Sequence, residues 1–325
     1  MKRRRNDYDV TNTVQTTDPV DVEAEIGRIF ALLYPRRADG RIRQAVGDAA
    51  RLFRGEYPGY AACDTAYHDL QHTLDVCLAM ARIMAGYVRE QRDGTIDADL
   101  FAFGVIAALF HDAGYIRRTS DSVHANGAEY TKVHVTRSGR FLRDYLRHIG
   151  LGKFGAAAAP TLHFTGYERS AQQIRVPDPV FRLIGNMLGS ADIIAQMSDR
   201  CYLEKCYGRL YPEFVLGQVD RRKNADGHEE VIFASAEDLV MRTPQFYQTA
   251  MKRLHQQLDA MMRFAAEHSE QRNLYVEEAE KNIQYARRLA SDGGIGGLRR
   301  QPPGESDANA NDVEHVPPPK RRASS

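Results

Sequence analysis

Residues 67–91 read YHDLQHTLDVCLAMARIMAGYVREQ, and this stretch predicts the central helix of the fold. From Leu70 to about Gln91, apolar side chains recur at the spacing of one helical face. They are Leu74, Cys77, Leu78, Ala81 and Met84. Such a stripe predicts a helix that packs against other helices in an apolar core.

Similar patterns predict helices along most of the chain. Asp18-Pro19 opens one that runs to about Tyr34, because apolar residues follow there at helical spacing. Further helices are expected at 41–53, 98–112, 125–149, 160–164, 178–198, 202–214 and about 244–289, the last of which an interruption near 268–273 could divide. The best candidate strand, 231–233, is too short to shape the fold. The predicted fold class is therefore all-α, a globular helical bundle.

Length and composition fit one helical unit between two tails. The chain has 325 residues, 43% of them hydrophobic, and a net charge of +1, which does not indicate a nucleic-acid partner. We expect a disordered polar tail over 1–18, a single helical unit over 19–290 and a disordered Pro-, Gly- and Arg-rich tail over 291–325. The basic residues of both tails are expected to be solvated.

Targeting signals are not evident in the sequence. The basic start over residues 1–5 is followed by polar residues rather than an apolar region. No stretch approaches the ~18 apolar residues of a membrane span. The four cysteines lack CxxC spacing and are expected to be reduced thiols, although a metal role for Cys201 and Cys206 stays open. We therefore expect a cytoplasmic protein without a membrane partner, which could form a homodimer.

Residue types that bind divalent metals recur in or beside the predicted helices. His68 and His72 are four residues apart and share one helical face, and a His111-Asp112 doublet ends an apolar run. Asp192 lies among apolar residues, where a carboxylate is costly unless it is paired or metal-bound. Each motif alone also fits ordinary surface or core side chains. Together, imidazoles and carboxylates suit Zn, Fe, Mn or Co, which acidify bound water.

The order of these motifs resembles the HD-domain superfamily of metal-dependent phosphohydrolases over most of 60–215. Residues 67–76 resemble the Tyr-His-Asn-x-x-His-x-x-Asp-Val signature of cyclic nucleotide phosphodiesterases, with Asp69 in place of Asn. The resemblance implies that His68 is the general acid for the leaving oxygen. It also implies one or two divalent ions, drawn from Zn, Mn, Fe, Ni, Co and Mg. The implied ligands of the first ion are His72, His111, Asp112 and Asp192.

After the doublet the sequence departs from the phosphodiesterase pattern. Those enzymes continue as His-Asp-x-x-His-x-Gly, whereas Tyr115 replaces the second histidine here, which puts their metal-bridging arrangement in doubt. The motifs of cyclic-dinucleotide and alarmone hydrolases are missing too. The chain is more similar to generic bacterial HD phosphohydrolases, through the segments 127–135 and 192–199, and the substrates of that group are largely unassigned.

Further residues near the motifs are candidates for secondary roles. His134 and His163 are spaced as additional ligands of two-metal HD sites can be, although either could be a core histidine bonded to a backbone carbonyl. Tyr67 and Tyr115 could stack on a base or simply pack. Basic residues that could bind phosphate, or be solvated instead, are Arg117, Lys132, Arg200 and Lys205.

The resemblance therefore implies a metal-dependent phosphohydrolase that uses metal-bound hydroxide to cleave a phosphoester. The expected substrate is a small-molecule phosphoester, foremost a nucleotide or cyclic nucleotide phosphodiester. One alternative is a non-catalytic, metal-stabilised HD sensor or scaffold module. A second is a di-iron oxygenase on the same fold, for which His134 and His163 would be extra ligands.

Overall fold

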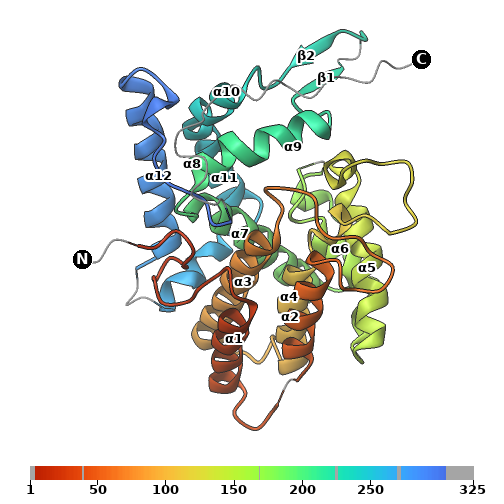
Figure 1. The fold of residues 1–325 in the computed structure, drawn as a ribbon. Helices are drawn as coiled ribbons and strands as arrows, with labels where there is room; N and C mark the ends of the chain where they lie inside the picture. The colour runs from red at the N-terminus through yellow and green to blue at the C-terminus, as the bar shows by residue number, and fades with distance from the viewer. Residues whose placement is uncertain (1–3, 39, 168, 224–225, 269–271, 305–325) are drawn as a thin grey trace.

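Helix α3 (Leu70–Gln91) lies at the centre of the fold in the computed structural model, which describes residues 4–38, 40–167, 169–223, 226–268 and 272–304 (Figure 1). Its boundaries confirm the predicted helix. The helix begins after Asp69, whose carboxylate accepts a hydrogen bond from the backbone N–H of His72 (2.8 Å). Its main neighbours include α1 (Pro19–Leu33), α4 (Ala98–Leu109), α7 (Pro179–Ser198) and a 3₁₀ segment, η6 (Met261–His268).

The remaining elements confirm the predicted all-α class. The other helices are α2 (Gly40–Phe53), α5 (His134–His148), α6 (Gly155–Leu162), α8 (Tyr202–Lys205), α9 (Tyr211–Leu216), α10 (Ala236–Met241), α11 (Thr243–Gln256) and α12 (Leu274–Ser291). A short antiparallel hairpin pairs β1 (Arg221–Lys223) with β2 (Glu229–Val231). In the described ranges, no helix combines the length and the apolar composition that crossing a membrane requires.

Two of the long predicted helices are broken in the structure. The predicted helix over 125–149 is a 3₁₀ turn, η2 (Gly127–Tyr130), followed by α5. The predicted helix over 244–289 already ends at Gln256, because Asp259 and Ala260 adopt positive φ angles of 52°. The 3₁₀ segment η6 then leads to α12.

The prediction of a disordered N-terminal tail is wrong for residues 4–18. This segment folds back on itself through a bridge between Tyr8 and Gln15 and buries Val10. The buried Asp9 carboxylate accepts a hydrogen bond from the Arg82 guanidinium of α3 (2.6 Å). An ion pair between residues so far apart in sequence leaves no local pattern, which explains the error.

The predicted disordered tail over 291–325 is likewise wrong for its described part, which ends at residue 304. Arg300 donates a hydrogen bond to Asn282 of α12 (2.6 Å), and the carbonyl oxygen of Pro303 accepts one from Arg209 (2.6 Å). Residues 305–325, with the predicted basic end, lie outside the described residues.

Candidate metal centre and adjoining cavity

Three helical segments bring metal-binding side chains to one point. His72 lies in the first turn of α3, and Asp192 lies on α7, which packs against α3. His111 and Asp112 follow the end of α4, where the chain turns into the 3₁₀ segment η1 (Ala113–Tyr115). His72, His111 and Asp112 form a buried cluster that could hold a metal ion.

The donor atoms of this cluster are separated by distances that one ion could bridge. Asp112 Oδ2 lies 3.1 Å from His111 Nε2 and 3.4 Å from His72 Nε2. Asp192 Oδ1 lies beside them, 3.6 Å from His72 Nε2 and 3.9 Å from His111 Nε2. Neighbouring ligands with bonds of about 2.1 Å are roughly 3.0–3.5 Å apart around one ion. Only small movements would therefore bring the three donors of the cluster onto an ion, and Asp192 lies close enough to both histidines to be a candidate fourth ligand.

The hydrogen bonding of His111 fits the role of a ligand. Its Nδ1 donates to the carbonyl oxygen of Ala108 (2.8 Å), which leaves Nε2 facing the carboxylates, where its unprotonated form could bind a metal. This buried Nε2 has no hydrogen-bond partner among the described residues. A buried polar atom without a partner is unfavourable, and coordination to a metal would satisfy it.

Protonation and metal binding would compete at this cluster. Burial lowers the pKa of His111, but the charges of Asp112 and Asp192 outweigh this effect and raise it to about 9. Burial raises the pKa of Asp112, but interactions with His111 and His72 bring it well below its usual value. Metal binding would therefore release a proton from His111.

His68 stands beside the cluster and is held by Glu213, a residue that the sequence analysis missed. The Nδ1 atom of His68 donates to Glu213 Oε2 (2.5 Å), and Glu213 Oε1 accepts from the backbone N–H groups of Tyr67 and His68. Burial lowers the pKa of His68, but the Glu213 charge outweighs it and raises the pKa to about 9. Glu213 is the one acid within the mostly apolar helix α9, and the burial argument applied to Asp192 could have identified it.

Tyr115, where the phosphodiesterase pattern has a histidine, fills the space between two histidine rings. Its ring stacks on His68 (centroids 4.4 Å apart) and on His134 (4.3 Å). The Nδ1 atom of His134 donates to a backbone carbonyl (2.6 Å), and its Nε2 lies 3.6 Å from Asp112 Oδ1. The structure thus brings His134 next to the cluster, whereas His163, at the end of α6, does not line the cavity beside it.

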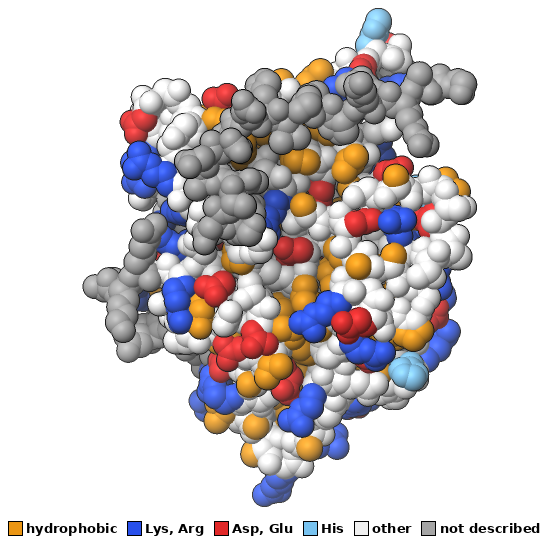
Figure 2. Space-filling model, in the orientation of Figure 1, with side chains coloured by type: hydrophobic (Ala, Val, Ile, Leu, Met, Phe, Trp, Pro, Cys, Tyr) orange, Lys and Arg blue, Asp and Glu red, His pale blue; other side chains and the backbone are white. Residues whose placement is uncertain are grey.

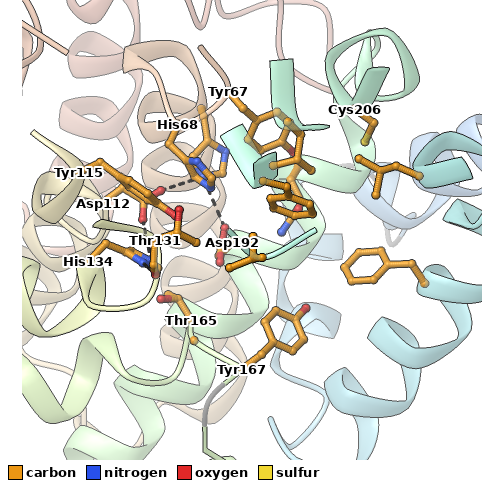
Figure 3. A pocket seen from close by; sticks show the side chains of 18 of the residues that line it. Tyr67, His68, Asp112, Tyr115, Thr131, His134, Thr165, Tyr167, Asp192 and Cys206 are labelled. Carbon is orange, nitrogen blue, oxygen red and sulfur yellow. Dashed lines mark hydrogen bonds and ion pairs between the residues drawn. The ribbon is translucent and has the colours of Figure 1, made fainter. Parts of the chain in front are cut away.

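A cavity of about 470 Å³ opens beside the cluster. Its wall includes His72, Asp112 and Asp192, and Figure 3 shows Tyr67 and Tyr167 around the same space. This volume lies within the range of small-molecule sites. The candidate metal centre therefore faces a space large enough for a substrate.

Of the four basic residues predicted to contact phosphate, the structure places Lys132 on the cavity wall. Arg117 is ion-paired with an aspartate (2.8 Å) and does not line the cavity. Lys205 is buried and ion-paired with Asp199 (2.5 Å), and Arg200 donates to an asparagine of the N-terminal segment (3.0 Å). The last three make structural contacts outside the cavity.

The cysteines are free thiols. Cys206 lines the cavity, but neither Cys206 nor Cys201 belongs to the metal cluster found among the described residues.

Comparison with known proteins found no matching family model, no matching curated protein and no matching solved structure.

Proposed function

We propose that the protein is a metal-dependent phosphohydrolase of the HD-domain type. One observation carries this proposal: His72, His111 and Asp112 converge, with Asp192 alongside, on the wall of a cavity where His68 is held by a buried carboxylate. The agreement between this arrangement and the motif order of the sequence supports the family resemblance.

Each side chain of the site has a role in the proposed reaction. His72, His111, Asp112 and Asp192 would hold a divalent ion, which would supply Lewis acidity toward a phosphoryl oxygen and a water molecule. His68 protonates the departing oxygen, because its imidazolium form carries a proton on the nitrogen that does not face Glu213. Glu213 fixes the orientation of the ring and stabilises its charged form.

The number of ions is part of the proposal. His134 approaches the free oxygen of Asp112 and could extend the site to a second ion, whereas His163 does not line the cavity. A single ion, or two that share Asp112, fits this arrangement. A di-iron oxygenase that required both histidines as ligands fits it less well.

The main alternative is a metal-stabilised module without catalytic activity. Such a module needs the metal cluster but has no need of a charged imidazole at its edge. The hydrogen-bonded pair of His68 and Glu213 therefore favours the enzyme.

The test combines metal analysis of the purified protein with hydrolysis of bis-p-nitrophenyl phosphate and p-nitrophenyl phosphate under added Mn²⁺, Zn²⁺ or Ni²⁺. Asp192→Ala should lose metal and activity together, whereas His68→Ala should keep the metal and lose activity. His148→Ala, an exposed position outside this cavity, is the matched control and should keep both. Bound metal without hydrolysis of either ester by the wild type would contradict the proposal and favour the non-catalytic module.

A further inference from the structure

Away from the metal cluster, the cavity wall is mainly apolar. Six side chains from the second half of the chain form this wall: Leu210, Phe214, Val219, Phe233, Leu239 and Phe246. The rings of Phe214 and Phe233 stack with centroids 5.6 Å apart, and Leu210 and Leu239 are buried. These contacts give the organic part of a ligand an ordered apolar surface.

Two aromatic side chains extend this wall. Tyr167, which Figure 3 shows pointing toward the same space, lies with its ring centroid 6.4 Å from that of Phe246. The Arg253 guanidinium lies over the Tyr167 ring, 4.1 Å from its centroid, and helps to hold it in position. Tyr167 is nevertheless 54% exposed, so part of its ring is open to contact with a ligand.

The positive charge around the cavity is small. The chain has 44 Lys and Arg residues. Among the described residues that line the cavity, the only ones of these types are Lys132 and Arg242. Arg242 is ion-paired with Asp238 (2.7 Å). At the metal end, Asp112 and Asp192 would balance a divalent ion. The site can therefore neutralise one phosphate group, whereas a polyphosphate would keep several charges without partners.

We propose that this cavity selects esters that carry a single phosphate group and a bulky apolar aryl or alkyl group. This inference rests on the proposed function and deepens it. The phosphate lies at the metal end near Lys132, and the organic group contacts the apolar wall. A nucleoside would instead place part of its ribose against the six apolar side chains, which offer its hydroxyls no hydrogen-bond partner.

The test measures binding rather than turnover. Methylphosphonate and phenylphosphonate are titrated calorimetrically into the Mn²⁺-loaded full-length protein, since neither can be hydrolysed. The phenyl ring should tighten binding about tenfold or more, because it removes roughly 100 Å² of apolar surface from water. Phe246→Ala should reduce this ratio severalfold. Phe181→Ala, a half-buried phenylalanine outside the cavity, is the matched control and should keep the ratio.

The outcomes separate this inference from the proposed function. Equal affinities for the two phosphonates, a ratio that Phe246→Ala does not change, or no binding of either compound would overturn the inference, even in an active enzyme. A retained ratio in a protein that hydrolyses no ester would overturn the proposed function and leave the selectivity of the cavity intact.

Discussion

Asp192→Asn should abolish the stabilisation of the protein by divalent metal. A ligand that binds only the folded state at a hundred times its dissociation constant adds about 2.7 kcal/mol to the free energy of unfolding. For a chain of this size, that corresponds to a rise in Tm of about 4 °C. Asp192 supplies one of the two carboxylates near His72 and His111. If its loss weakens binding about a hundredfold, the same metal concentration adds only about 0.4 kcal/mol, and the rise in Tm falls below about 1 °C.

The assay is thermal unfolding after treatment with EDTA, with and without added Mn²⁺ or Zn²⁺. The rise in Tm on adding metal is compared within each protein, because the isosteric substitution also removes the attraction between Asp192 and protonated His111 in the metal-free state. Asp144→Asn, whose side chain is 61% exposed outside the cavity, is the control and should keep the full rise in Tm. A full rise in the Asp192→Asn variant would refute the assignment of Asp192 as a ligand.

Three further predictions concern the surroundings of the site. Glu213→Gln should lower kcat/KM most at high pH, because the pKa of His68, about 9 beside Glu213, should fall toward 6.5 and leave less of the protonated acid. A pH–rate profile that matches the wild type between pH 6.5 and 9 would contradict the role of Glu213. Asp9→Asn should cost about 3–5 kcal/mol near neutral pH, because it leaves Arg82 buried without an anion. Burial raises the pKa of Asp9, but Arg82 brings it below 3.8, so the difference from wild type should shrink as the pH falls below about 4 in urea unfolding. Gly114→Ala should lower both Tm and metal affinity, because its Cβ would lie 2.0 Å from a backbone oxygen at the start of α5. Wild-type values of both would show that η1, which carries Gly114, and α5 can move apart without cost.

The sequence predicts those parts of the fold that local patterns specify. The limits of α3 follow from its apolar stripe and from the cap at Asp69. The break after Gln256 was missed because Asp259 and Ala260 adopt positive φ without a glycine to indicate it. The ordered N-terminal segment was missed because its main anchor, the ion pair of Asp9 with Arg82, joins residues that are distant in sequence.

In the candidate site, too, local motifs predict some residues, whereas others are brought in by contacts between residues distant in sequence. The order of histidines and aspartates predicts a cluster, and the structure brings His72, His111 and Asp112 together. Glu213 was missed because its contact with His68 spans more than a hundred residues and belongs to no motif. Nearness to a motif in sequence was also a poor guide to three of the four basic residues, since the contacts of Arg117, Arg200 and Lys205 depend on the tertiary packing.

Lys205 shows what that packing does for the site. Its sequence position beside the Asp192 segment predicted a phosphate contact, yet its ammonium group is buried and donates to Gln71 on α3 (2.9 Å) and to Asp199 at the end of α7 (2.5 Å). Burial lowers the pKa of Lys205, but Asp199 outweighs this and raises it, so the group stays charged. Gln71 adjoins His72, and Asp199 directly follows the last residue of α7, the helix that carries Asp192. These charge-assisted bonds therefore hold together the two helices that supply candidate ligands, and Lys205 contributes to the site by positioning its donors rather than by touching a substrate.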